Sequence, residues 1–136
     1  MLTVLEKVDF LEHAEIFREV RTESLARVAS IAQEVSFEPR QPLFKENESA
    51  EAMFVLVEGE VILTHSGQEG SKLSEFQVAG ALAVFAERAH TETARAIRPT
   101  QAMRISQQDL YEAMAEDISI ARGILRALVC MVSDSR

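Results

Sequence analysis

The residues best suited to chemistry in this sequence gather within residues 80–97, "GALAVFAERAHTETARAI". This segment opens on Gly80, continues through a short apolar stretch and then carries Arg88 and His90. Glycine allows a tight turn, N–H groups at the start of a helix donate to anions, and arginine pairs with phosphate through two hydrogen bonds. The pattern is typical of a loop that binds a phosphate. However, the position after the glycine, where an acid could hold a sugar hydroxyl, is Ala81.

Composition limits the classes of protein to which the chain can belong. It has 136 residues, of which 47% are hydrophobic and 26% are charged, and its net charge is −8. These values predict one globular domain with no general attraction to nucleic acid or to an anionic membrane. No apolar run is long enough to cross a bilayer, so we expect no direct membrane insertion. The single Cys130 lies in an apolar helical pattern, and we expect a core residue and a cytoplasmic setting.

The elements that must position the 80–97 segment change in type along the chain. Helical spacing of apolar residues dominates both ends, whereas Pro39 and Pro42 introduce short β-type segments separated by turns. The stretch "SGQEGS" at 66–71 is typical of a hairpin loop, and Ser106 is a helix cap. We therefore predict a single α+β domain, 1–136, with about seven or eight short strands. Its parts are N-terminal helices at 1–34, a β-roll at 35–105 and two C-terminal helices at 106–134.

One stretch of this β region carries a family resemblance. "FKENESAEAMFVLVEGEV", residues 44–61, resembles the β-roll signature of cyclic nucleotide-binding domains of the catabolite-activator type. Its marks are Phe44, an acidic turn that contains Asn47, an apolar strand and Gly59. The preceding helix and its lead-in are similar to the family as well. The resemblance implies an antiparallel, jelly-roll-like β-roll, and it implies that residues 80–97 are a phosphate-binding cassette.

The cassette departs from the family pattern at both charged positions. In the family, a glycine precedes an acid that holds the ribose, and an arginine that neutralises the phosphate precedes a small or hydroxyl residue. Here Gly80 matches the glycine and Thr91 the hydroxyl residue, but Ala81 falls on the acid and His90 on the arginine. The resemblance thus implies a non-catalytic regulatory or interaction module that has lost cyclic nucleotide binding. The candidate site residues of this degenerate cassette are Gly80, Ala81, Leu82, Arg88, His90 and Thr91.

An alternative remains open for this cassette. Arg88 could turn into the pocket if the cassette is one turn longer, and a protonated His90 could hold an anion. The chain would then be a small-ligand or cyclic-nucleotide sensor with a non-standard pocket. Against this alternative, the short helix that follows Gly80 is strongly apolar. We expect it to bury itself against the roll and to leave the nucleotide space largely closed.

No other constellation in the sequence indicates chemistry. The three histidines, His13, His65 and His90, stand far apart and include no pair at metal-ligand spacing. No nucleophile motif or Walker loop occurs. We expect neither an enzyme nor a bound metal or cofactor.

The last helix carries two apolar stripes, and they bear on assembly. One stripe, which we expect to pack on the roll, consists of Ile118, Ala121, Leu125, Leu128, Val129 and Val132. The other has the 4-3-4 spacing of a coiled-coil seam and consists of Ile120, Ile124, Ala127 and Met131. We predict a homodimer through this seam, with Gly123 allowing close approach of the two backbones. The seam could instead pack on the N-terminal helices of the same chain, or on a partner or parent protein domain.

Overall fold

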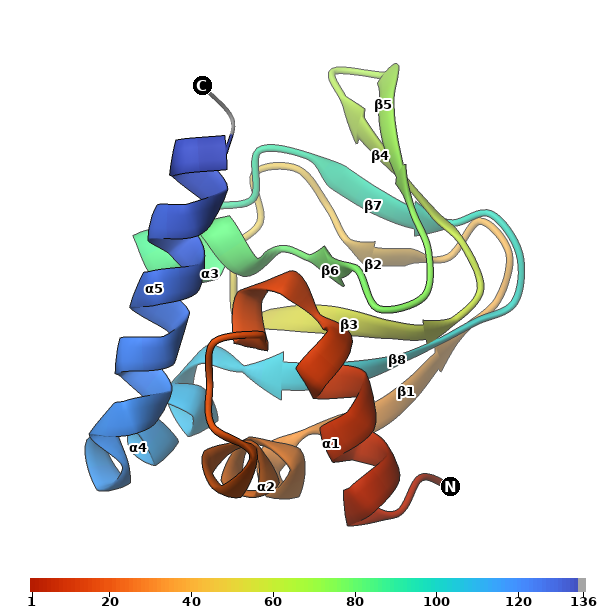
Figure 1. Ribbon diagram of the computed structural model, residues 1–136. Helices are drawn as coiled ribbons and strands as arrows, with labels where there is room; N and C mark the ends of the chain where they lie inside the picture. The colour runs from red at the N-terminus through yellow and green to blue at the C-terminus, as the bar shows by residue number, and fades with distance from the viewer. Residues whose placement is uncertain (135–136) are drawn as a thin grey trace.

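Two four-stranded antiparallel sheets form a roll, and helices cover one of its faces (Figure 1). This computed structural model describes residues 1–134. The strands are β1 (Gln33–Phe37), β2 (Pro42–Phe44), β3 (Ala52–Glu58), β4 (Val61–His65), β5 (Gln68–Leu73), β6 (Val78–Ala79), β7 (Thr93–Ala96) and β8 (Thr100–Ser106). The helices are α1 (Val4–His13), a short 3-10 helix η1 (Glu15–Phe17), α2 (Thr22–Ile31), α3 (Ala81–Ala86), α4 (Gln107–Glu116) and α5 (Ile118–Asp134). The predicted α+β roll with flanking helices is confirmed.

Each sheet is built from strands that lie far apart in the sequence. The strand order is β1-β8-β3-β6 in one sheet and β2-β7-β4-β5 in the other, and the paired strands are antiparallel. At the edge of the first sheet, β1 pairs with β8 in a register that sets Gln33 opposite Arg104. β2 lies against β7, which brings the start of the acidic turn to the end of the 80–97 segment.

Strand β3 joins the two hydrophobic cores of the domain. Successive side chains of a strand point to opposite faces of its sheet. Accordingly, Met53 and Val55 pack in the core between the sheet and the helices, whereas Phe54 and Leu56 pack in the core inside the roll. A strand buried on both faces needs a continuous apolar run, and "AMFVLV" supplies it.

Side-chain caps fix where three helices begin. The Thr3 hydroxyl accepts a hydrogen bond from the Glu6 N–H at 3.1 Å, and the Glu6 carboxylate accepts one from the Thr3 N–H at 2.9 Å. Ser106 caps α4 as predicted, since its hydroxyl accepts from the backbone N–H three residues on. The Asp117 carboxylate accepts from the Ser119 N–H at the start of α5. Such caps satisfy N–H groups that have no partner within the helix.

The packing of α5 reverses the assignment of its two stripes. Ile120 and Ile124 are only 0% and 3% exposed and Ala127 is buried, so the stripe assigned to a dimer seam belongs to the chain's own core. Met131, the fourth residue of that stripe, is half-buried. Most of the other stripe is exposed, as Leu125 shows at 61%, although Ala121 and Leu128 are half-buried. The prediction that this stripe of α5 forms a dimer seam, made for Ile120, Ile124, Ala127 and Met131, was therefore wrong. The alternative, that the stripe packs on the N-terminal helices of the same chain, is the one that the structure shows.

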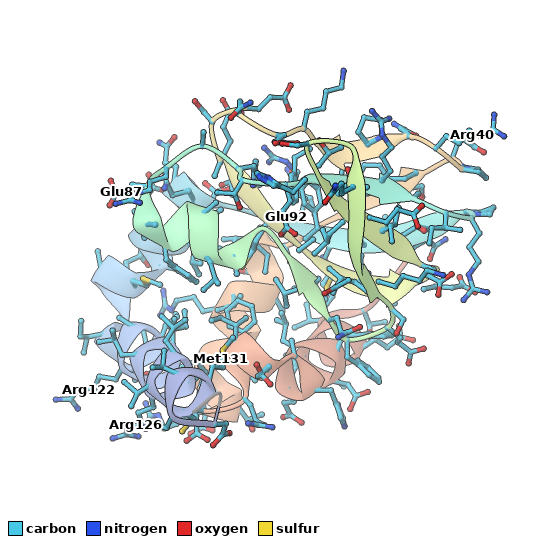
Figure 2. The ribbon with its side chains drawn as sticks, turned by 90° about the horizontal axis from the view of Figure 1, so that it is seen from above. Arg40, Glu87, Glu92, Arg122, Arg126 and Met131 are labelled. Carbon is cyan, nitrogen blue, oxygen red and sulfur yellow. The ribbon has the colours of Figure 1, made fainter. Side chains whose placement is uncertain are left out.

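A close approach of backbones explains this orientation of α5. A Cβ on Gly123 would lie 2.8 Å from the Cα of Val20, in the loop between η1 and α2. Only glycine permits that contact, so the glycine side of α5 must face the chain's own N-terminal segment rather than a second copy. Figure 2 shows the consequence at the opposite side of the helix, where Arg122 and Arg126 project away from the body of the protein.

The β4–β5 hairpin is longer than the sequence predicts. We expected residues 66–71 to form a loop, but β4 ends at His65 and β5 already begins at Gln68. Both turn residues, Ser66 and Gly67, have positive φ angles of 52° and 81°. Such angles match the twist of a two-residue hairpin turn.

Candidate functional site

The cassette segment is held in place by backbone hydrogen bonds to the acidic turn. The N–H of His90 donates to the carbonyl of Glu48 at 2.9 Å, and the N–H of Asn47 donates to the carbonyl of His90 at 2.8 Å. Asn47 has a φ of 73°, a left-handed conformation that asparagine tolerates better than most residues. These two bonds fix the His90 backbone, and with it the direction of the imidazole.

The His90 ring is enclosed by an aromatic side chain and by backbone. It stacks on Phe44 with a centroid distance of 3.7 Å and an interplanar angle of 11°, and the residue is only 4% exposed. Gly80, which caps α3 with a φ of 88°, closes the edge of this stack. A Cβ at Gly80 would lie 3.1 Å from both the His90 Cε1 and the Phe44 Cε2 atoms. Glycine is required here both for its backbone angle and for its lack of a side chain.

Burial sets the protonation state of this histidine. It lowers the pKa of the His90 imidazole below its ordinary value of 6.5, and the charge of Glu48 opposes that shift only in part. Because desolvation disfavours the charged form, the ring is mostly neutral at pH 7. At pH 7 residue 90 therefore presents a mostly uncharged aromatic ring.

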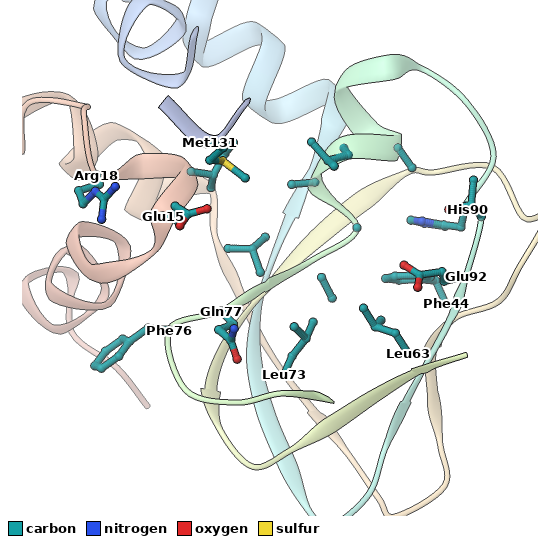
Figure 3. Close-up of a pocket in the computed structure, with 18 of the residues that line it drawn as sticks. Glu15, Arg18, Phe44, Leu63, Leu73, Phe76, Gln77, His90, Glu92 and Met131 are labelled. Atoms are coloured by element: carbon teal, nitrogen blue, oxygen red, sulfur yellow. The ribbon is translucent and has the colours of Figure 1, made fainter. Parts of the chain in front are cut away.

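A pocket of about 520 Å³ opens between the roll, α3 and the end of α5. Figure 3 shows Phe44, His90 and Glu92 on one side of it and Glu15 and Arg18 on the other. His13, Gln77, Gly80 and Thr91 also line the pocket, and apolar groups supply the rest of the wall. They are Ile16, Leu63, Leu73, Phe76, Val78, Ala79, Ala81, Leu82, Ala83 and Met131.

The expectation of a closed space was wrong. We expected the apolar helix after Gly80 to fill the nucleotide site, but only Val84 of α3 is fully buried. Leu82 is 64% exposed, and the side chains that α3 turns toward the pocket include the small Ala81 and Ala83. Methyl groups cannot fill a space of this size, and the pocket remains open.

Most of the predicted site residues meet at this pocket. Gly80, Ala81, Leu82, His90 and Thr91 all line it. Arg88 does not, because its side chain is exposed and its carbonyl accepts a hydrogen bond from the Ala50 N–H on the outer side of the cassette.

Sequence reasoning missed two residues that line the pocket at the His90 end. Glu92 is half-buried and lines the pocket, and Phe44 forms its aromatic wall. Phe44 was noted as a family mark but not as a site residue. A signal for Glu92 does exist, since it is a charged residue directly before the small-residue strand β7. Sequence reasoning also missed Met131 as a pocket residue, because its helical spacing placed it in the predicted coiled-coil seam.

The described residues contain no candidate metal site and no membrane-spanning helix. Within residues 1–134, no three of the histidine, cysteine, aspartate and glutamate side chains lie close enough to hold a metal ion. No helix in that range has the length and apolar character needed to cross a membrane.

Comparisons with known proteins place this geometry in a family. The sequence profile of the family described as "Cyclic nucleotide-binding domain" matches residues 34–117, which include both β-sheets and the cassette. No curated protein sequence matches the chain at a significant level.

Solved structures share the whole fold at low sequence identity. A provisionally assigned cyclic nucleotide binding protein from Ruegeria pomeroyi matches with a TM-score of 0.84 and 19% identity, over 98% of this chain and 61% of that chain. The N-terminal domain of a transcriptional regulator from Streptomyces coelicolor matches with a TM-score of 0.84 and 21% identity, over 93% of this chain and 92% of that chain. The sensor domain of the transcriptional regulator DNR from Pseudomonas aeruginosa matches with a TM-score of 0.74 and 20% identity, over 93% of this chain and 89% of that chain. The chain thus spans about three fifths of the Ruegeria protein and nearly all of the two regulator domains.

Proposed function

Because the chain belongs to the cyclic nucleotide-binding domain family, we propose that it is a non-catalytic regulatory module that has lost the binding of cyclic AMP and cyclic GMP. One observation carries this proposal. The position of the family's phosphate-binding arginine holds His90, which is buried, stacked on Phe44 and mostly neutral. A cyclic phosphate placed there would meet no cation and would lie in the same end of the pocket as the Glu92 carboxylate.

The two missing anchors would each contribute several-fold to the affinity for a cyclic nucleotide. Loss of one partner of a buried, hydrogen-bonded charge pair costs about 2–5 kcal/mol. An unpaired ribose hydroxyl at Ala81 adds about 1–3 kcal/mol. Together these terms weaken binding by about a hundredfold at the least, because each 1.4 kcal/mol is about a factor of ten.

Titration calorimetry with cyclic AMP and cyclic GMP tests the proposal. We expect no saturable heat for either nucleotide at micromolar concentrations, and a micromolar Kd for either would contradict the loss of binding. The double variant Ala81→Glu with His90→Arg restores both anchors. Binding by this variant would support the view that only the anchors have been lost. The single variant Ala81→Glu is the matched control, since it restores the ribose contact without a cation.

The alternative function, a sensor for a small ligand, is favoured by the open pocket. It is supported only through His90, because Arg88 lies outside the pocket lining. A ligand of this kind must tolerate a neutral imidazole and a carboxylate in place of an arginine. The two proposals are compatible, since a domain can exchange one ligand class for another while it keeps its regulatory role.

We also propose that the domain forms a homodimer through the exposed face of α5. The exposed apolar residues Ile118, Leu125 and Val129 are spaced seven and four apart, as in a coiled-coil seam. Two copies related by a two-fold axis would cover this stripe, which explains its apolar character. The net charge of −8 supports a protein partner rather than nucleic acid. The lone cysteine, Cys130, is exposed on α5, so the expectation of a core residue was wrong. A free cysteine is consistent with a cytoplasmic location.

A further inference from the structure

Two polar side chains at the end of the pocket near His90 have no hydrogen-bond partner among the described residues. Among residues 1–134, no group donates to or accepts from the His90 ring or the Glu92 carboxylate. No fully enclosed side-chain nitrogen or oxygen in this range lacks a hydrogen bond. The ring nitrogens of His90 must therefore retain contact with open space, although the residue is only 4% exposed. Since His90 lines the pocket, that open space is the pocket.

The electrostatic balance at this end of the pocket favours a positive ligand. Glu92 has no lysine, arginine or histidine nitrogen within ion-pair distance in the described chain. Figure 3 shows the one arginine of the lining, Arg18, on the opposite side of the pocket, close to Glu15. The neutral His90 supplies a hydrogen-bond acceptor and no charge. A half-buried carboxylate without a counter-ion attracts a cation and repels an anion.

The rest of this end of the pocket is suited to an apolar body. Phe44 and Leu63 lie beside Glu92 in Figure 3, and Leu73 lines the pocket farther along, next to Gln77. A volume of about 520 Å³ lies within the range of pockets that hold small organic molecules, and such pockets combine an apolar wall with a few placed polar groups.

We propose that this pocket binds an organic cation with an apolar body, which places an ammonium or amidinium group against Glu92 and donates a second hydrogen bond to the unprotonated ring nitrogen of His90. This inference rests on the proposed function, since a pocket that held a cyclic phosphate at His90 would select the opposite charge. The apolar body lies against Phe44, Leu63 and Leu73.

Three test ligands of similar size and different charge examine the proposal directly. They are 2-phenylethylammonium, 2-phenylethanol and 3-phenylpropanoate, titrated at millimolar concentrations into the ¹⁵N-labelled protein. Amide signals of Gly80, His90 and Glu92 report occupancy by NMR. We expect the ammonium ion to shift these signals to saturation with a Kd about tenfold or more below that of the alcohol, because hydrogen bonds to charged groups are worth about 1.5–3 kcal/mol. The anion should bind most weakly. Equal affinities, tighter binding of the anion, or no binding of any of the three would overturn the proposal.

A pair of variants with the same change in net charge locates the effect. Glu92→Gln breaks no hydrogen bond or ion pair of the described chain, so the protein should fold normally. In this variant we expect the ammonium ion to bind no better than the alcohol. Glu69→Gln removes an exposed carboxylate of β5 that does not line the pocket, and it should leave all three affinities unchanged. If Glu69→Gln weakens the ammonium ion as much as Glu92→Gln does, the attraction is a property of net charge and the proposed site is wrong.

Cyclic AMP in the same NMR assay separates this inference from the proposed function. Micromolar binding of cyclic AMP refutes the loss of nucleotide binding, whatever the amine does. If neither cyclic AMP nor the ammonium ion binds, the proposed function stands and the inference of a cationic ligand fails alone.

Discussion

Replacement of Gly80 by alanine tests how tightly the His90–Phe44 stack is packed. Gly80 has a φ of 88°, and a Cβ there would lie 3.1 Å from an edge atom of each ring. Left-handed backbone costs a residue with a Cβ about 1–2 kcal/mol. Insertion of a methyl group into a packed site costs about 1–3 kcal/mol more. We therefore expect Gly80→Ala to lower the free energy of unfolding by about 2–5 kcal/mol.

The chain offers a matched control for the backbone part of this cost. Gly67 has a similar φ of 81°, but a Cβ there would meet no atom within 4 Å. Gly67→Ala should therefore lose only the conformational part, about 1–2 kcal/mol. Urea unfolding of both variants measures the difference, provided that the m-values match. If the two variants lose the same free energy, the rings move aside at no cost and the enclosed stack described here is wrong. Addition of His90→Ala to Gly80→Ala should recover part of the contact cost, which a double-mutant cycle detects.

Three further predictions concern α5 and the titrating groups. Leu125→Glu changes the exposed stripe of α5 and should convert a dimer to a monomer in sedimentation without loss of structure. Ile124→Glu buries a charge and should destabilise the fold by more than about 3 kcal/mol. A stable, monomeric Ile124→Glu protein would contradict the burial of the Ile124 side of α5. His90 has a lowered pKa, so the unfolded state takes up a proton first as the pH falls below 6.5, and the native protein should lose stability from there down through the folded pKa. Urea unfolding at pH 7.5 and 5.5 should show a smaller loss for His90→Gln than for wild type, and equal losses would refute a neutral buried ring. Hydrogen bonds from Ser119 and Ser24 lower the pKa of Asp117 below 3.8, so its contribution to stability is present at neutral pH and is lost as the pH falls through that lowered pKa. The difference in melting temperature between wild type and Asp117→Asn should therefore be present at pH 7 and shrink toward pH 3. A difference that stays constant with pH would refute this contribution of Asp117.

Local signals in the sequence were sufficient for most of the fold. The uninterrupted apolar run at 52–57 predicted a strand, and the structure shows that β3 is buried on both sides. Ser106 predicted the start of α4, and Gly80 predicted the turn into a short helix. Each of these features depends on residues close together in the chain, which is why the sequence alone reveals them.

Features decided by distant contacts could not be predicted in the same way. Strand β5 consists almost entirely of exposed polar residues, and only its pairing with β4 makes it a strand. The two stripes of α5 are both apolar, and helical periodicity cannot say which one faces inward. The contact of Gly123 with Val20 decides it, and that contact joins residues about a hundred positions apart. Glu92 is close to His90 in the sequence, but only the fold shows that it lines the pocket.

The pairing of β1 with β8 has a consequence for how the protein is made. Gln33 and Arg104 are partners in that ladder, and 104 − 33 gives a separation of 71 residues. A ribosome adds about 5–20 residues per second, so β1 is synthesised about 4–14 s before its partner exists. During that time β3 also lacks β8, its longest neighbour. The apolar faces of α1, α2 and β3 therefore stay uncovered on the nascent chain until β8 has been synthesised. This interval, rather than the stability of the finished domain, is when the chain is most exposed to aggregation and to chaperones.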